Sequence, residues 1–332
     1  MPKSLVFIEY LYKTKINDII INIKLKGAYM EKEFKSGFVS ILGRTNVGKS
    51  TLINSLVGEK IAIMTNKPQT TRTAIRAIVN RENAQIVIID TPGIHKPKTK
   101  LGKTMIDTAF DATADVDVIL FLIEATSKDI GPGDRRILDK IKEANKKTIL
   151  IINKIDLVNK EELLGLIKLY SEEYDFEAVL PISALQQNSK EIVLNEIEKL
   201  LKVGPVYYDV EEYTDQTMRQ LAEETIREKA LKLLDDEVPH GLYVEVNKMK
   251  LSKSMEDNKP FYNIDATIYC LRESHKGIII GKKGQMLKRI GTYARQDLEE
   301  MLGMKVNLKT WVKVKEDWLD SDNIVKKFKF NS

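Results

Sequence analysis

The chain has very little cysteine and no long apolar run. Its single cysteine among 332 residues, Cys270, excludes a disulfide framework, and because no histidines accompany it at ligand spacing, a structural zinc site is excluded too. No apolar run approaches the roughly 18 residues that cross a bilayer. The first 36 residues contain no arginine and no small-residue cleavage site, which excludes a transit or secretory peptide. We therefore expect a cytosolic protein.

Length and charge are consistent with two domains and a polyanionic partner. A single domain usually holds about 100–200 residues, so a chain of 332 predicts two. Apolar residues make up 43% and charged residues 30%, which is typical of a globular chain and excludes a disordered one. The formal charge is +5, from 53 basic and 48 acidic residues. This value permits nucleic-acid binding without requiring it, so the position of the surplus matters more than its size.

The first half alternates buried strands with helices. Phe38–Leu42 is a continuous apolar run that ends at Gly43, the pattern of a strand buried on both faces. Apolar and polar residues alternate over 75–79 and predict an edge strand that turns back through 81–83. Further strands are expected at 86–89, 118–123, 148–152 and 178–180, with helices at 50–56, 135–144 and 161–174. This order predicts an α/β domain with a mostly parallel sheet and helices on both faces.

The pattern changes after a helix stop at Val203–Pro205. Helical spacing at 221–234, alternating strands at 242–246 and 264–270, helical sequence at 285–302 and a strand at 306–314 predict an α+β domain of order α-β-β-α-α-β. The expected segments are an N-terminal extension (1–36), the α/β domain (37–203), a linker (204–216), the α+β domain (217–320) and a C-terminal tail (321–332). Met30 is one candidate for the natural start of the protein, and a genuine N-terminal arm is the alternative.

A phosphate-binding loop follows the first strand. Gly43–Ser50 matches G-x-x-x-x-G-K-S between a buried strand and a helix, which is the context that the motif requires. Glycines let backbone N–H groups surround phosphate oxygens, Lys49 supplies a charge for the β- and γ-phosphates, and Ser50 ligates Mg²⁺. The expected nucleotide-binding residues here are Gly43, Asn46, Val47, Gly48, Lys49, Ser50 and Thr51. Asn46 has two interpretations, a hydrogen bond that stabilises the loop, which we favour, and a ligand for a catalytic K⁺.

A second motif, Asp90–Gly93, follows the strand at 86–89. Asp90 is expected to hold Mg²⁺ at the same sheet edge, and the backbone N–H of Gly93 to approach the γ-phosphate. A threonine is also needed for Mg²⁺ and for sensing that phosphate. We favour Thr71, then Thr70, over Thr73, and expect Lys49, Thr71, Asp90 and Gly93 to be the catalytic set. Ile94 stands where some GTPases place a water-orienting glutamine, so intrinsic hydrolysis should be slow.

Two further motifs select the base. Asn153–Asp156 follows the strand at 148–152, and a carboxylate there can accept from both N1–H and N2–H of guanine, whereas adenine has no such donors. A backbone N–H of the loop formed by Ser183, Ala184 and Leu185 could reach guanine O6. The expected base-binding residues are Asn153, Lys154, Asp156, Ser183, Ala184 and Leu185. The four motifs in this order predict GTP, with GDP as product.

The second half concentrates positive charge around one glycine loop. Gly281–Gly284 has the form G-x-x-G and is expected between two helices, where backbone can approach nucleic-acid phosphates closely. Between Arg272 and Arg295 there are seven basic residues and one acidic residue, Glu273, a local surplus larger than that of the whole chain. We expect single-stranded RNA to bind here, with Lys276, Lys282, Lys283, Lys288 and Arg289 contributing. For Trp311, packing against a neighbouring element is favoured over base stacking.

The motifs together resemble a known family. G-R-T-N-V-G-K-S, Q-T-T-R, D-T-P-G-I-H-K-P, N-K-I-D and S-A-L, followed by H-K-G-I-I-I-G-K-K-G-Q-M-L-K-R-I-G and W-V-K-V-K-E-D-W, are similar to those of the Era family of bacterial GTPases over roughly residues 37–319. The resemblance implies a P-loop GTPase domain followed by a type II KH domain. It also implies that Gly281–Gly284 and the neighbouring isoleucines, Ile279 among them, contact RNA.

The resemblance implies a role in ribosome assembly. The family binds the small (30S) ribosomal subunit and the 3′ end of its 16S RNA, in an arrangement of domains that GTP favours, and it associates peripherally with the inner membrane. We expect a monomer with GTP or GDP and Mg²⁺ as ligands. Two alternatives remain at this point: a GTPase recruited to a membrane or another partner whose KH domain is only an auxiliary contact, and an RNA-binding adaptor that does not hydrolyse GTP.

Overall fold

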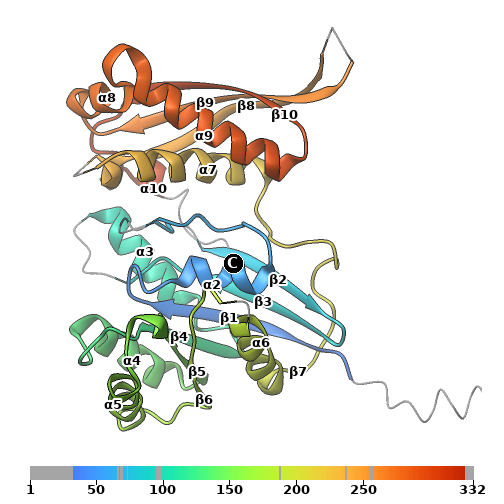
Figure 1. Cartoon of the computed structure of the whole chain (residues 1–332), viewed down its shortest axis with the longest axis vertical. Helices are drawn as coiled ribbons and strands as arrows, with labels where there is room; N and C mark the ends of the chain where they lie inside the picture. The colour runs from blue at the N-terminus through green and yellow to red at the C-terminus, as the bar shows by residue number, and fades with distance from the viewer. Residues whose placement is uncertain are drawn as a thin grey trace, which may run out of the picture. The chain divides into compact units, whose positions relative to one another are not determined.

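The computed structural model describes residues 33–65, 67, 70–72, 74–94, 99–186, 188–235, 238–254 and 258–325. By its internal contacts the chain separates into Met1–Phe34 and Lys35–Ser332, and the description below concerns the second unit. The expectations for residues 1–32 and for Thr73 lie outside the described residues. The described residues of Lys35–Ser332 form two sheets, each with its own helices and its own apolar core (Figure 1).

The first sheet has seven strands and is mostly parallel. Its order is β2-β3-β1-β4-β5-β6, with β7 paired to β1. β2 is antiparallel to β3, β7 is antiparallel to β1, and the remaining pairs are parallel. The strands are β1 (Lys35–Gly43), β2 (Ile75–Arg81), β3 (Ala84–Asp90), β4 (Val118–Glu124), β5 (Lys147–Asn153), β6 (Ala178–Pro181) and β7 (Lys202–Val203). The expected hairpin and parallel sheet are therefore present.

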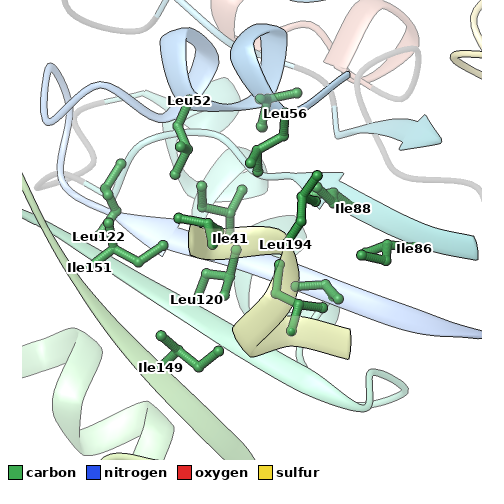
Figure 2. Close-up of a cluster of buried hydrophobic side chains, with 14 of the residues drawn as sticks. Ile41, Leu52, Leu56, Ile86, Ile88, Leu120, Leu122, Ile149, Ile151 and Leu194 are labelled. Carbon is green, nitrogen blue, oxygen red and sulfur yellow. The ribbon is translucent and has the colours of Figure 1, made fainter. Parts of the chain in front are cut away.

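Helices cover both faces of this sheet. They are α2 (Lys49–Val57), α3 (Lys100–Asp111), α4 (Pro132–Ala144), α5 (Lys160–Ser171) and α6 (Asn188–Leu200). On one face Leu52 and Leu56 of α2 point toward Ile41 and Leu120 of the sheet, together with Leu194 of α6 (Figure 2). On the other face α3, α4 and α5 cover a second core. Helices α3 and α6 were not predicted from the sequence, although both carry apolar residues at helical spacing.

The second sheet has three strands in the order β10-β9-β8. β8 (Tyr243–Lys253) is antiparallel to β9 (Pro260–Cys270), and β10 (Lys305–Val314) is parallel to it. The helices are α7 (Met218–Leu233), α8 (Glu273–Ile280) and α9 (Gln285–Leu302), which gives the expected α-β-β-α-α-β order. Cys270 is fully buried in the core between the sheet and these helices.

Side chains of the two halves also meet directly. Leu101 and Met105 of α3 form a small buried cluster with Tyr243 of β8 and with Trp318. The linker between the halves runs beside the first sheet, where the buried Gln85 accepts hydrogen bonds from the backbone N–H groups of Tyr207 and Tyr208. Helix α3 therefore contacts the second half of the chain, and the linker contacts the first sheet.

Candidate nucleotide site and nucleic-acid interface

The predicted nucleotide motifs meet at one edge of the first sheet. Gly43, Asp90 and Asn153 are the last residues of the parallel strands β1, β3 and β5, so their side chains or following loops lie at the same edge. The phosphate loop ends at Gly48, where φ is +104°, and a Cβ there would lie 2.3 Å from Nδ2 of Asn153. Only glycine fits this backbone and this close approach.

Lys49 is buried inside the loop that precedes it. Its ammonium group donates to the carbonyl oxygens of Gly43 at 3.1 Å and of Arg44 at 3.0 Å. Burial lowers the pKa of Lys49 to about 8, and the nearby negative charge of Asp90 opposes this shift. A phosphate anion in the loop would therefore meet the Lys49 ammonium group already in position, with its positive charge only partly balanced by nearby anions.

Asp90, Ser50 and Thr71 place their side-chain oxygens together. The Ser50 and Thr71 hydroxyls are 3.1 Å apart, and Thr71 Oγ1 donates to Asp90 Oδ2 at 3.3 Å. Oδ1 of Asp90 is buried and has no hydrogen-bond partner among the described residues. Burial raises the pKa of Asp90 to about 6, with Lys49 opposing the shift. These hard oxygen ligands, one of them without a partner, fit a Mg²⁺ ion.

The geometry distinguishes Thr71 from Thr70. Thr70 Oγ1 bonds instead to Thr65 Oγ1 at 2.8 Å and to the Lys67 carbonyl at 2.7 Å, so it is directed away from Asp90. Ile94, which follows the Asp90–Gly93 motif, is buried in the core behind the sheet and donates its backbone N–H to the Gly43 carbonyl at 3.2 Å. Its side chain has no polar atom and no exposure with which to orient a water molecule.

Asn153 connects the phosphate loop to the base-binding loops. Its Nδ2 donates to the Val47 carbonyl at 2.8 Å, and its Oδ1 accepts from the backbone N–H of Ala184 at 2.9 Å. Lys154 has a positive φ of 66° and its Nζ pairs with Glu124 at 2.9 Å. The Ser183 carbonyl accepts from Ser189 Oγ at 2.7 Å, which holds the third loop in place. A single buried side chain thus fixes three motifs relative to one another.

A cavity of about 290 Å³ lies at this edge of the sheet. Its lining contains the phosphate-loop residues from Thr45 to Thr51, except Val47, whose side chain is buried in the core. Thr71, Gly93 and Lys154 also line it. Asp156 and Leu185 lie outside the cavity lining and are exposed to solvent, Leu185 by 83%. The lining residues that were not identified from the sequence are Ile63, Met64, Thr65 and, from α7, Lys232.

The G-x-x-G loop, Gly281–Gly284, lies between two helices, α8 and α9, as the sequence predicted. Gly281 ends α8 with φ +70°, and a Cβ there would lie 2.7 Å from Cβ of Met286. Lys282 and Lys283 are exposed within the loop. Lys288 and Arg289 are exposed on the first turns of α9, whereas Lys276 pairs with Glu273 at 3.3 Å. Exposed cations therefore lie beside backbone that a phosphate chain can approach closely.

One expectation in this half was wrong, and one stays open. Ile279 is completely buried in the core of the second sheet, so its side chain is not available to RNA, whereas its neighbour Ile278 is 50% exposed. Trp311 is 45% exposed, so a large part of its ring is open to solvent, and neither packing nor base stacking is decided by this position. It shares the exposed face of β10 with Lys309 and Lys313, because alternate residues of a strand point the same way.

Comparison with known proteins identifies the family. A model for 50S ribosome-binding GTPases matches residues 38–154, and a KH-domain model matches residues 237–319. GTPase Era of Clostridioides difficile is 51% identical over 299 residues, which is 90% of this chain and 99% of that protein. The chain belongs to the Era family. GTPase Era of Ruminiclostridium cellulolyticum is 50% identical over 88% of this chain and 96% of its own length.

Solved Era structures share the whole fold. A crystal structure of Era with MgGDPNP and nucleotides of 16S ribosomal RNA superposes with a TM-score of 0.84 at 40% identity, over 89% of this chain and 98% of that one. An Aquifex aeolicus Era variant bound to GDP·AlF4⁻ gives the same TM-score and identity, over 89% and 99%. Era chains of this kind therefore combine the P-loop GTPase fold and the KH fold.

None of the helices described for this chain has the length and apolar character of a bilayer-spanning segment.

Proposed function

We propose that this Era-family protein is a GTP-hydrolysing switch that binds the 3′ end of 16S ribosomal RNA through its KH domain and acts in assembly of the 30S subunit. The observation that carries the proposal is that the phosphate loop, Thr71, Gly93 and Lys154 line one cavity, in a chain that also presents a basic G-x-x-G loop. The Ser183–Leu185 loop is joined to this site by the hydrogen bond from the Ala184 N–H to Asn153. The Era structure that contains MgGDPNP and a 16S RNA fragment supports both ligands.

In the proposed site, Ser50, Thr71 and Asp90 hold Mg²⁺, which supplies positive charge to the β- and γ-phosphates. Lys49 binds the same phosphates, and the Gly93 backbone senses the γ-phosphate. Asn46 in the loop stays a candidate ligand for K⁺, because it adopts a positive φ of 66° and lines the cavity. With Ile94 in the core, water must be oriented by backbone groups or by a partner, so unstimulated hydrolysis is slow.

Guanine is recognised by Asp156 together with Asn153, Lys154 and the backbone of Ser183–Leu185. Asp156 is exposed, so its carboxylate is available to accept from the base once a nucleotide is bound. A carboxylate left unpaired by adenine accounts for selection against ATP. This assignment is supported by the hydrogen bonds from Asn153 that hold the loops together.

RNA binding is assigned to the G-x-x-G loop and the cations around it. These residues are Lys276, Gly281, Lys282, Lys283, Gly284, Lys288 and Arg289, with Ile278 in place of Ile279. We retain 37–203 as the GTPase domain and 217–320 as the KH domain, with 204–216 as the linker. The protein is proposed to act as a cytoplasmic monomer that also associates peripherally with the inner face of the membrane.

Multiple-turnover GTP hydrolysis tests the nucleotide half of the proposal. The wild-type chain should turn over slowly alone and faster with 30S subunits, and Lys49→Ala should lose both GTP binding and hydrolysis. Hydrolysis that persists in Lys49→Ala would show that the site is assigned wrongly, and a complete lack of turnover with 30S subunits present would favour a non-catalytic adaptor.

Crosslinking the full chain to RNA and sequencing the bound fragments tests the other half. Enrichment of the 3′ end of 16S RNA is expected. Random recovery of RNA, combined with nucleotide-dependent flotation on vesicles of anionic lipid, would favour the membrane-recruited alternative.

A further inference from the structure

A side chain from the KH half of the chain lines the nucleotide cavity. Lys232 lies in the last turn of α7, whereas the other lining residues belong to the GTPase half, among them Lys49, Ser50 and Thr71. The side chain of Lys232 is 45% exposed, and its Nζ donates to Glu228 Oε1 at 2.6 Å. An anion in the cavity therefore meets a cation that none of the nucleotide motifs contributes.

Glu228 fixes Lys232 at this position. Its side chain is fully buried one helical turn before Lys232, and it also pairs with Lys60 at 2.7 Å. The backbone N–H of Met64, a cavity residue, donates to the same carboxylate at 3.4 Å. Burial acts to raise the pKa of Glu228, but hydrogen bonds from Lys232 and Lys60 hold it below the ordinary value. The carboxylate is thus a permanent anion that anchors Lys232 beside the cavity.

The charges around Glu228 do not cancel. Lys60, Lys229 and Lys232 share two carboxylates, Glu228 and Asp297, so this cluster carries one surplus positive charge. Lys60 and Lys229 both contact Asp297, which lies on α9. Lys232 is the lysine of the cluster that faces the cavity. The surplus therefore favours negative charge in the nucleotide cavity rather than elsewhere on the surface.

We propose that Lys232 is a nucleotide-binding residue that the KH domain contributes to the GTPase site, where its ammonium group attracts the phosphates of guanosine di- and triphosphates. Glu228 is its positioning residue. Since Lys232 belongs to α7, nucleotide binding and the placement of the RNA-binding half become linked through one side chain. The ligand class is a nucleoside polyphosphate, and a guanosine without phosphates would gain nothing from this contact.

Fluorescence titration of the full-length chain with labelled GMP, GDP and GDPNP tests the proposal. Because Lys232 is partly exposed, Lys232→Ala should weaken GDP and GDPNP binding by about three- to fivefold. Lys232→Glu should weaken it by roughly tenfold or more, and Lys232→Arg should stay near wild type. GMP should be affected less than GDP and GDPNP. The loss should shrink at about 0.5 M KCl, because salt screens partly exposed charges.

Lys229→Ala is the matched control. It removes a lysine from the same helix and the same cluster, but from a position outside the cavity lining. Nucleotide affinity should therefore be retained in Lys229→Ala. Glu228→Gln, which releases Lys232 without removing its charge, should lower GDPNP affinity less than Lys232→Glu. Equal losses in Lys229→Ala and Lys232→Ala would mean that contact between the halves, and not a phosphate contact, explains the effect. Unchanged GDPNP affinity in Lys232→Glu would overturn the proposal directly.

Discussion

Replacement of Asn153 by alanine should weaken the nucleotide site and the fold together. The side chain is 2% exposed and makes one hydrogen bond to each of two loops, to the Val47 carbonyl and from the Ala184 N–H. Alanine would leave both backbone groups without their partner. It would also open space beside Gly48, whose backbone passes close to Asn153 Nδ2.

The size of the effect follows from those two groups. A buried polar group left without a partner costs about 1–3 kcal/mol. Two such groups would be left in the interior, so the free energy of unfolding should fall by about 2–6 kcal/mol in total. Nucleotide affinity should fall as well, because the phosphate loop and the base-binding loop are no longer held at a fixed separation.

The affinity loss should be similar for GTP analogues and GDP. Asn153 contacts the phosphate loop at Val47 and the base-binding loop at Ala184, whereas the γ-phosphate is expected near Thr71 and Gly93. The ratio of the affinities for GDPNP and GDP should therefore stay unchanged. Urea denaturation gives the unfolding free energy, and titration with labelled GDP and GDPNP gives the affinities. Asn159→Ala is a suitable control, since Asn159 caps α5 away from the cavity and should cost only about 1 kcal/mol without changing affinity.

Two results would refute this reasoning. If Asn153→Ala unfolds with the wild-type free energy, the two hydrogen bonds do not stabilise the fold. If it loses stability but binds GDP as tightly as Asn159→Ala does, the loops do not depend on Asn153 for their spacing, and the site must be held by other contacts.

Further predictions concern pH, the segment at Thr70 and Thr71, and RNA. Burial raises the pKa of Asp90 to about 6, so the folded state binds the proton more tightly than the unfolded chain, and the unfolding free energy of the nucleotide-free protein should fall as pH rises from about 4 to about 6. Denaturation at several pH values should show this slope, and Asp90→Asn should remove it. Arg227 is buried and donates to the Thr70 carbonyl, so Arg227→Ala should cost roughly 2 kcal/mol and raise the Mg²⁺ concentration needed for GDPNP binding. Replacing Gly281 and Gly284 with aspartate should abolish RNA binding in a filter assay while GTP hydrolysis in the absence of RNA stays at the wild-type rate; intact RNA affinity would contradict the interface.

The architecture was largely predictable because buried parallel strands leave a strong signal. A run such as Phe38–Leu42 has few interpretations other than a buried strand. The phosphate-loop motif that follows it, Gly43–Ser50, is itself typical of a loop between a strand and a helix. The helices α3 and α6 were missed although their signal was present. Leu101, Met105 and Ala109 repeat every four residues, and Thr99 caps the helix by accepting from the Gly102 N–H at 3.1 Å.

Side-chain direction was harder to predict than the elements. Ile278, Ile279 and Ile280 are consecutive, and consecutive residues of a helix point in different directions. Without the position of the sheet, nothing in the sequence distinguished the buried Ile279 from the exposed Ile278. The face of Trp311 was equally hard to predict, because a large apolar residue on an alternating strand can lie on either face, and here the exposed face is the one that carries the lysines.

Contacts between distant segments left no signal in the sequence. Lys232 reaches the nucleotide cavity from a helix that begins more than 160 residues after the phosphate loop. In the sequence it is one lysine of an amphipathic helix. Thr71 is a second case, since the hydroxyl chemistry of Thr70 is identical and only the hydrogen bonds to Ser50 and Asp90 distinguish the two.

The most direct test of the account is the affinity of the full-length chain for RNA in two nucleotide states. Fluorescence anisotropy would compare single-stranded RNA of the 16S 3′-terminal sequence with a scrambled RNA of equal composition, in the presence of GDPNP or GDP. We predict that the authentic RNA binds at least about tenfold more tightly than the scrambled one, and that GDPNP strengthens this binding relative to GDP. Equal affinity for both RNAs, unchanged by the nucleotide, would contradict the claim that the chain is an RNA-binding GTPase switch.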